Sequence, residues 1–366
     1  MRLSALAAST ILAFGFTACS SSSLAPAGGV QDAVGSQSHF KNGRFVPVWS
    51  EYASLIPIEL RPGGFAATIR EVTVHPDRRR DKGGIYVSSF EGGSILGYRN
   101  PNLKNDGPFC TVRSLGAVND IAVDAKGYLI VPAINTSEGG FVTVFRGPGM
   151  CGAQDGPAVS DPYGQPSDAA SANASVGTIV VGNIFDKSDS PGSISLCSDV
   201  TGYGCTTNLT NPAMYEVAGV ALAKNGDCWA SAANTSGIAT LTYFKGCSGG
   251  GQQATGYLNN YYGGLDIDDA GNLVSISAFD GEIYVYKGCN PACKVVGGPF
   301  PMQNEAVFGH LDKKSKQFAV GDFLSGQVDV FKYSPTKITY YYSFNNGLCA
   351  STCEIEGVAF NPRSKE

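Results

Sequence analysis

The sequence predicts an all-β fold, a single β-propeller of six or seven blades. A unit of three short strands joined by tight turns recurs along the chain. Well-aligned copies begin at Val220, Leu265, Phe308 and Val358, at intervals of 45, 43 and 50 residues. The copy that begins at Val358 has no later strands of its own. A period of about 40–50 residues with three or four strands per unit is typical of propeller blades. Pairing of the two chain ends would close the ring and remove open sheet edges.

Residues 262–288 form the clearest copy. Strands are expected at 264–267, 273–278 and 282–287, because β-branched and aromatic residues suit a pleated surface there. The two turns between them are rich in Asp, Asn and Gly, which tolerate tight turns and positive φ. One such sheet cannot bury both of its faces alone, so neighbouring copies must pack against each other.

The other copies repeat the same order of strand, turn and strand. The first is expected to begin with a strand at 71–74. The strands expected after it are 85–87 and 94–98 in the first copy, 119–123, 128–131 and 141–145 in the second, 177–182 and 192–196 in the third, 216–222, 228–232 and 239–244 in the fourth, and 308–311, 317–321 and 327–331 in the sixth.

Six copies are complete, and residues 356–362 restart the pattern as a closing strand. A seventh blade built from 356–362 and the apolar runs within 44–60 is the alternative. A β-sandwich would not need six similar units.

The start of the chain predicts export and a lipid anchor. An apolar run too short to span a bilayer ends in Phe16-Thr17-Ala18-Cys19, which resembles a bacterial lipoprotein box. The resemblance implies that residues 1–18 are a signal peptide and that Cys19 is lipidated, with palmitate among its acyl chains. The alternative is an ordinary secretory signal that contains a cysteine. Residues 19–42 are expected to be a flexible tether, and 43–366 the propeller domain.

These features predict a protein of the bacterial cell envelope, held by its lipid in the membrane. Ser20 after the cysteine implies, by the same resemblance, the outer membrane. The formal net charge of −5 argues against a nucleic acid as partner, because nucleic-acid binding needs a basic face. We expect a monomer that binds a protein or a glycan.

The cysteines predict a disulfide framework. Besides Cys19, the chain has an even number of cysteines, as exported proteins with structural disulfides do. Three expected pairs are close in sequence: Cys197–Cys205, Cys289–Cys293 and Cys349–Cys353. Cys228 and Cys247 lie on adjacent predicted strands, and Cys110–Cys151 is the pair that then remains.

Oxygen-bearing side chains gather at one predicted face of the propeller. Residues just before the first strand of a copy and just after its second strand share a face, because the two strands are antiparallel. A ring of carboxylates and amides there suits a hard cation or a polyol. The alternative is that these side chains satisfy backbone N–H groups at strand ends. The expected funnel-mouth residues are Glu71, Glu91, Asn135, Glu216, Asn234, Glu305, Asp322 and Glu354.

Residues 119–127 and 264–273 resemble blades of NHL-type and SMP-30 (gluconolactonase)-like propellers. The resemblance covers about residues 70–362 and implies the propeller fold. It also implies one divalent cation, Ca²⁺ or Mg²⁺, held by a Glu, an Asn and an Asp. Glu356, in Glu-Gly-Val-Ala-Phe, is similar to the family's Glu-Gly-Pro, whereas Asn119-Asp120 stands where the family has Asn-Gly. The candidate metal ligands are Glu356, Asn119, Asp120, Asn183 and Asp280.

Nucleophilic catalysis has little support in the sequence. The histidines are His39 in the tether, His75 in a turn and His310 inside a first strand. None is placed to activate a nucleophile at the predicted mouth. We therefore predict a non-enzymatic binding or scaffold module for a protein, peptide or glycan. The alternative is an SMP-30-like lactonase or hydrolase that depends on a divalent metal.

Overall fold

The computed structural model assigns all described residues to one unit, Ser38–Glu366. None of the described residues belongs to a helix long and apolar enough to cross a membrane. The residues that the structure describes are 39–41, 44–46, 72–74, 84–89, 93–99, 107–112, 118–124, 127–136, 139–145, 158–170, 178–186, 191–198, 204–303, 306–322, 325–348 and 355–361.

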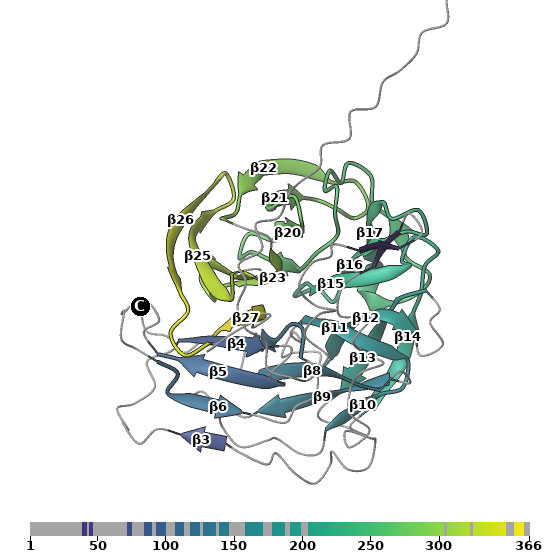
Figure 1. Ribbon diagram of the computed structural model, residues 1–366. Helices are drawn as coiled ribbons and strands as arrows, with labels where there is room; N and C mark the ends of the chain where they lie inside the picture. The colour runs from purple at the N-terminus through teal and green to yellow at the C-terminus, as the bar shows by residue number, and fades with distance from the viewer. Residues whose placement is uncertain are drawn as a thin grey trace, which may run out of the picture. The chain divides into compact units, whose positions relative to one another are not determined.

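Three sheets have four antiparallel strands in chain order, as the repeats predict. Figure 1 shows them in teal, green and yellow. A 3₁₀ turn, η4 (Lys245–Cys247), lies between β17 and β18. The strands are β15 (Glu216–Leu222), β16 (Cys228–Ala233), β17 (Ala239–Phe244) and β18 (Gln252–Gln253), then β19 (Leu265–Ile267), β20 (Leu273–Ser277), β21 (Glu282–Lys287) and β22 (Lys294–Pro301), and finally β23 (Ala306–Leu311), β24 (Gln317–Asp322), β25 (Gln327–Ser334) and β26 (Lys337–Phe344).

A fourth sheet joins the two ends of this unit. β27 (Ile355–Phe360) pairs antiparallel with β4 (Ile85–Ser89), which is followed by β5 (Ser94–Tyr98) and β6 (Cys110–Val112). The C-terminal strand therefore takes the innermost place, as expected for closure by the chain ends. The segment expected to fill that place, β3 (Val72–Val74), instead pairs with β6 at the outer edge. The prediction for 71–74 was wrong in position, because the C-terminal strand is the one that pairs with β4.

An eight-stranded sheet contains the second and third copies. Its two halves run in the same order as the other sheets and join where β10 lies parallel to β14. The third copy needs a first strand, β11, whose sequence Gly-Gln-Pro-Ser-Asp-Ala-Ala has no strand pattern, so it was not predicted. The strands are β7 (Ala122–Val123), β8 (Leu129–Thr136), β9 (Gly139–Phe145) and β10 (Val159–Asp161), and β11 (Gly164–Ala170), β12 (Ile179–Asp186), β13 (Ser193–Ser198) and β14 (Gly204–Leu209).

A short hairpin of β1 (His39–Lys41) and β2 (Arg44–Val46) precedes these sheets. β1 lies at the end of the range expected to be tether.

The innermost strands of neighbouring sheets contact one another, which gives the propeller-like arrangement in Figure 1. β15 contacts β11 and β19, and β23 contacts β19 and β27. Glycines allow the close approach. A Cβ on Gly219 would lie 2.2 Å from the carbonyl oxygen of Gly263, and one on Gly357 would lie 2.6 Å from Asp120 Cα. Both distances are too short for any side chain.

Apolar side chains fill the space between adjacent sheets. One buried cluster joins Val180 and Ile194 of the eight-stranded sheet to Val217, Val220 and Phe244 of the next sheet. A strand with apolar residues on both faces can bury both only when sheets stack on each side of it. This explains the runs of buried residues in the inner strands.

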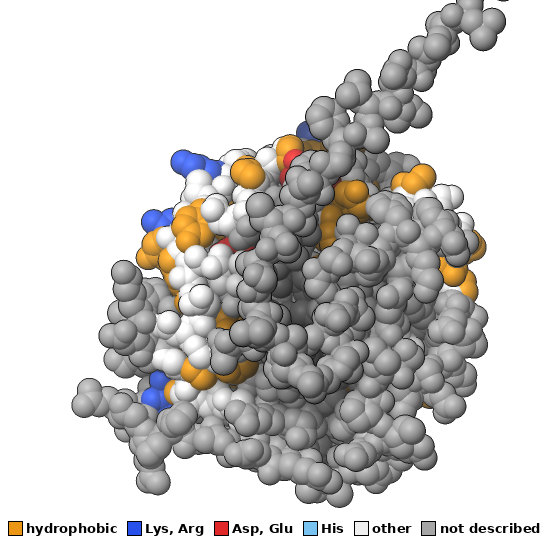
Figure 2. Space-filling model, in the orientation of Figure 1, with side chains coloured by type: hydrophobic (Ala, Val, Ile, Leu, Met, Phe, Trp, Pro, Cys, Tyr) orange, Lys and Arg blue, Asp and Glu red, His pale blue; other side chains and the backbone are white. Residues whose placement is uncertain are grey.

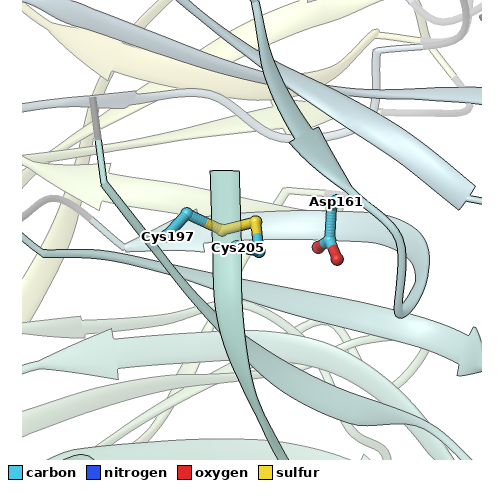
Figure 3. Close-up of side chains that lie close together, drawn as sticks. All are labelled: Asp161, Cys197 and Cys205. Carbon is cyan, nitrogen blue, oxygen red and sulfur yellow. A yellow bond between two sulfur atoms is a disulfide. The ribbon is translucent and has the colours of Figure 1, made fainter. Parts of the chain in front are cut away.

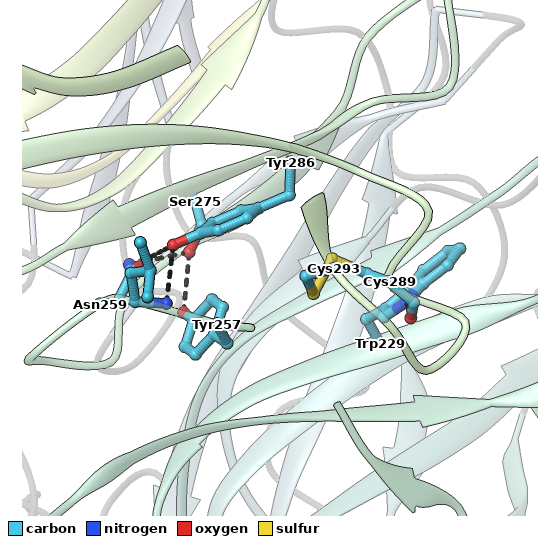
Figure 4. Close-up of a disulfide and its surroundings, with 8 residues drawn as sticks. Trp229, Tyr257, Asn259, Ser275, Tyr286, Cys289 and Cys293 are labelled. Carbon is cyan, nitrogen blue, oxygen red and sulfur yellow. Dashed lines mark hydrogen bonds between the residues drawn. A yellow bond between two sulfur atoms is a disulfide. The ribbon is translucent and has the colours of Figure 1, made fainter. Parts of the chain in front are cut away.

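Buried polar groups also connect neighbouring sheets (Figure 4). The Tyr257 hydroxyl lies 3.1 Å from Ser231 Oγ on β16 and 2.8 Å from Ser275 Oγ on β20. The Tyr286 hydroxyl donates to Asn259 Oδ1 at 2.7 Å. Hydrogen-bonded in this way, the hydroxyls can be buried without the cost of an unmade bond.

Three of the five predicted disulfides lie within the described residues and are confirmed: Cys197–Cys205, Cys228–Cys247 and Cys289–Cys293. In Figure 4 the last of these lies beside Trp229, whose indole N–H donates to the carbonyl oxygen of Cys289 at 2.6 Å. Cys110 is also disulfide-bonded. The remaining cysteines, Cys19, Cys151, Cys349 and Cys353, lie outside the described residues.

The outer strand β26 carries exposed aromatic residues. Tyr340 and Tyr341 are each 45% exposed, and Lys332 Nζ lies 4.5 Å above the ring of Tyr341. Figure 2 shows hydrophobic side chains next to Lys or Arg side chains on the part of the surface over β25 and β26. The Tyr341 ring is partly shielded by this cation contact.

Candidate functional site

Four side chains from three sheets meet where the innermost strands approach one another. Asp120 lies just before β7, Asp168 in β11, Asp266 in β19 and His310 in β23. One atom each of Asp120, Asp168 and His310 lies within 4.8 Å of the other two. Asp120 is 1% exposed, Asp168 0%, and the side chain of His310 12%. The group is therefore largely shut off from water, where charges interact strongly.

His310 lies between two carboxylates. Its Nε2 is 2.9 Å from Asp120 Oδ2, and its Nδ1 is 3.4 Å from Asp266 Oδ2. The Leu311 N–H also donates to Asp266 Oδ2 at 2.7 Å, which fixes that carboxylate. Burial lowers the pKa of His310, but the charges and hydrogen bonds of Asp120 and Asp266 outweigh it and raise the pKa well above 6.5. Without another cation present, the imidazolium form is favoured.

Asp168 is the most enclosed acid of the group. Its Oδ2 accepts a hydrogen bond from the Val220 N–H at 2.7 Å, whereas its Oδ1 has no hydrogen-bond partner among the described residues. Burial, followed by the charge of Asp120, raises the pKa of Asp168 well above its ordinary value, although His310 and the Val220 N–H oppose this. A carboxylate in this place needs a proton or a cation to offset its charge.

A cavity of about 210 Å³ opens next to the cluster, at the ends of β7, β15, β19, β23 and β27. His310 and Asp266 line it, so the pocket and the cluster share two side chains. The apolar wall includes Val123, Leu222, Ile267, Leu311 and Phe360. The other polar lining residues are Asp269, Asp312, Lys313 and Ser315.

The pocket lies at the opposite ends of the inner strands from the predicted funnel mouth. The predicted residues lie before the first strand of a repeat, whereas the pocket residues lie at and after its end. The sequence argument considered only one of the two faces of the propeller, so this pocket was not predicted.

A second buried group of possible ligands consists of Asp161, Cys197 and Cys205 (Figure 3). The two sulfur atoms are joined in a disulfide, so neither is a thiolate that could bind a metal. Burial raises the pKa of Asp161 to about 6, against the hydrogen bonds from Tyr163, Ser195 and Asn183. This group stabilises the sheet and is not a metal centre.

The five metal ligands that the sequence suggested lie in different surroundings. Asp120 belongs to the central cluster, but Glu356, though buried in β27, is in neither group of three among the described His, Cys, Asp and Glu residues. Asn119 Nδ2 donates to the Pro166 carbonyl oxygen at 3.2 Å, and Asn183 Nδ2 donates to Ser195 Oγ at 2.7 Å. The Oδ1 atom of each, which is the atom that could bind a metal, has no hydrogen-bond partner among the described residues.

Asp280 is exposed, and its Oδ2 accepts hydrogen bonds from Asn260 and Ser277. Asn183 and Asp280 were alternatives for one ligand position, and Asn183 is buried whereas Asp280 is exposed. A divalent ion held by Glu356, by Asn119 or Asp120, and by Asn183 or Asp280 stays a prediction.

Three of the predicted funnel-mouth residues lie within the described structure and form side-chain hydrogen bonds with their neighbours. Glu216 Oε2 accepts a hydrogen bond from the Tyr262 hydroxyl at 2.5 Å. Asn234 Oδ1 accepts from the N–H groups of Ser236 and Ile238, and Asp322 accepts from Ser325. These bonds hold turns and adjoining sheets. The side chain of Asn135 and the residues Glu71, Glu91, Glu305 and Glu354 lie outside the described residues.

Sequence reasoning missed Asp168, Asp266 and His310 as site residues. Asp266 and His310 alternate with apolar residues in their strands, and a polar residue on the inward face of a buried strand was an available signal. Asp168 gave no such signal, because its segment does not have a strand pattern.

No protein-family model matches this chain, and no curated protein matches it either. The solved structures that resemble it include one titled as a nidogen/laminin complex, with a TM-score of 0.56, 13% identity, and coverage of 76% of this chain and 98% of the other. Hydrazine synthase of Kuenenia stuttgartiensis gives a TM-score of 0.51 and 13% identity over 80% and 90% of the two chains.

The periplasmic gluconolactonase PpgL of Pseudomonas aeruginosa gives a TM-score of 0.52 and 12% identity over 76% of this chain and 99% of the other. At such low identity these likenesses show the β-propeller fold alone.

Proposed function

We propose that this protein is a binding module that receives one side chain of a protein or peptide partner in the pocket beside His310. The observation that carries the proposal is the pocket lining, which combines apolar side chains with the carboxylates of Asp266, Asp269 and Asp312. A pocket of about 210 Å³ is smaller than the roughly 300–1,000 Å³ of a drug-sized ligand site. Its size suits one long side chain.

The charge of the pocket favours a basic side chain. Asp269 is exposed at the pocket, and Asp266 and Asp312 add two carboxylates, against the amine of Lys313 and the imidazole of His310. The stem of Lys or Arg packs on apolar surface while its head reaches a carboxylate. A glycan is less well matched, because Phe360 is the single aromatic ring in this lining and sugars often stack on such rings.

We do not propose the alternative metal-dependent lactonase. Glu356, the residue that best matches the family's motif, is in neither group of three possible ligands among the described His, Cys, Asp and Glu residues. The similarity to a gluconolactonase extends to the fold only.

We further propose a six-bladed, monomeric propeller. This count takes the eight-stranded sheet as two blades, β7–β10 and β11–β14. Two observations support this count. Each half has the same strand order as the other sheets. The two halves are joined where β10 pairs with β14 at a single position, Ser160 with Gly204.

The place of the protein in the cell follows from its first residues. We propose that the chain is lipidated at Cys19 and displayed on the outer membrane of a bacterial envelope, where a binding module would meet envelope proteins. Cys19→Ala should release the protein from membranes into the soluble fraction on cell fractionation. Retention of the variant in the membrane would contradict the anchor.

The pocket can be tested with peptide arrays in which one central position is varied, probed with the purified chain. We expect binding to peptides with Arg or Lys at that position. Asp269→Lys should abolish it, and Asp280→Lys, a charge reversal at an exposed site away from the pocket lining, should not. Binding to a parallel glycan array instead, or equal loss in both variants, would overturn the proposal.

A further inference from the structure

We propose that Asp120, Asp168 and His310 form a binding site for one divalent transition-metal ion, Zn²⁺ or Mn²⁺. Asp120 and Asp168 come from the two ends of the eight-stranded sheet and His310 from the sheet of β23, and one atom of each lies within 4.8 Å of the other two. Two carboxylate oxygens and an imidazole nitrogen are all established metal donors. The proposal does not rest on the pocket's binding a peptide.

The second observation is an unsatisfied oxygen inside the cluster. Asp168 is 0% exposed, and its Oδ1 has no hydrogen-bond partner among the described residues. Such an atom costs about 1–3 kcal/mol when it is left unpaired in a protein interior, and more when it is charged. A cation at this point would supply the missing interaction.

The charges around the cluster also favour a cation. Asp120, Asp168 and Asp266 contribute three carboxyl groups, and His310 is the only basic side chain in the described cluster. The two positive charges of one divalent ion would be balanced by the negative charges of Asp120 and Asp168, while His310 would bind in its neutral form. In a largely buried site such a balance matters more than it would in water.

Asp266 completes the arrangement from outside the ligand set. In the metal-bound state His310 Nε2 would exchange its 2.9 Å contact with Asp120 for the ion, while Nδ1 keeps its proton toward Asp266 Oδ2 at 3.4 Å. Metal-bound histidines commonly donate their second ring N–H to a carboxylate, which orients the ring. Asp266 is therefore a positioning residue.

The donor set indicates the class of ion. Imidazole suits Zn²⁺ and other transition metals, and carboxylate suits Mn²⁺ as well as Mg²⁺ and Ca²⁺. Three protein ligands are too few for Ca²⁺, which takes six to eight oxygens in its sites. Because His310 also lines the pocket, the ion has a route from the surface to its ligands.

The test is calorimetric titration of the untagged, chelator-treated chain with Zn²⁺, Mn²⁺, Ca²⁺ and Mg²⁺, with ions per chain counted by native mass spectrometry. We expect one Zn²⁺ or Mn²⁺ per chain. Asp168→Asn and His310→Gln should each weaken binding at least 100-fold. Asp266→Asn should weaken it about 10- to 100-fold, as loss of a partner to a ligand does. Asp280→Asn is the matched control and should bind like the unaltered chain.

Circular dichroism of each variant separates loss of the site from loss of the fold, and His310→Gln serves if Asp168→Asn does not fold. Absence of stoichiometric Zn²⁺ or Mn²⁺ binding would overturn the proposal and leave a proton as the charge that neutralises Asp168. Binding that survives both ligand variants would overturn it as well. Either result is independent of the peptide arrays.

Discussion

The hydrogen bond between Tyr262 and Glu216 should make a large contribution to the stability of the propeller. Tyr262 is 2% and Glu216 3% exposed, and the tyrosine hydroxyl donates to Glu216 Oε2 at 2.5 Å. Burial, followed by the charge of Glu216, raises the pKa of Tyr262 well above 10. The hydroxyl therefore remains a donor throughout the neutral range. The bond connects β15 to the segment just before β19.

Tyr262→Phe removes the donor and keeps the ring. A hydrogen bond to a charged group contributes about 1.5–3 kcal/mol, and its loss leaves the buried carboxylate with one partner fewer. With an unfolding entropy of about 2.1 cal/mol/K per residue, a domain of roughly 320 residues loses about 1.5 °C of Tm per kcal/mol. We expect Tm to fall by about 2–4 °C.

Thermal unfolding followed by circular dichroism measures this change. Tyr340→Phe is the matched control, because Tyr340 is 45% exposed and its hydroxyl contacts Ser343 at the surface; a surface change of this kind stays within about 0.5 kcal/mol. Adding Glu216→Gln to Tyr262→Phe should recover part of the loss, since a neutral amide costs less to bury. The reasoning is refuted if Tyr262→Phe lowers Tm no more than Tyr340→Phe does.

Three further predictions follow from the same structure. Burial and the charge of Asp322 raise the pKa of Asp329 to about 6. The folded state therefore binds this proton more tightly than the unfolded state does, and it loses stability as pH rises from about 4 to about 6. Asp329→Asn should raise Tm more at pH 7.5 than at pH 5, and an equal rise at both pH values would contradict this reasoning. Gly357→Ala would place a Cβ 2.6 Å from Asp120 Cα and should lower the free energy of unfolding by at least about 1–3 kcal/mol. Gly250→Ala is the control, because its Cβ would have nothing within 4 Å. It should leave Tm nearly unchanged in the same melting experiment. Cys228 and Cys247 are 19 residues apart, and Cys289 and Cys293 are 4 residues apart. Because a disulfide that closes a longer loop removes more entropy from the unfolded chain, replacing the first pair by Ser should cost about 3 kcal/mol and replacing the second pair about 2 kcal/mol. A larger loss of Tm for the second pair would argue against this account.

Much of the fold could be predicted from local sequence signals. Alternating apolar and β-branched residues bounded by Gly, Asn and Asp placed β15, β19, β20 and β23 close to their observed bounds. Spacing alone was enough for Cys197–Cys205 and Cys289–Cys293. These signals work because strand alternation and tight turns depend on residues only a few positions apart.

The places of two strands were decided by pairing across the chain. β11 has Gly, Pro and Asp in a segment without alternation, and it forms a strand because β12 pairs with it. β3 looked like a first strand but lies at an outer edge, because β27 arrives from the far end of the chain and pairs with β4. Such pairings depend on closure of the ring, and no local pattern encodes them.

The candidate site belongs to the tertiary structure for the same reason. By itself, the sequence determined the repeat, the strand faces and three observed disulfides. It did not determine which inward-facing side chains meet. Asp120 and His310 are 190 residues apart in the sequence but lie in contact at 2.9 Å, because β7, which follows Asp120, and β23, which contains His310, are innermost strands. Radial convergence of separate sheets brings the acids and the histidine together.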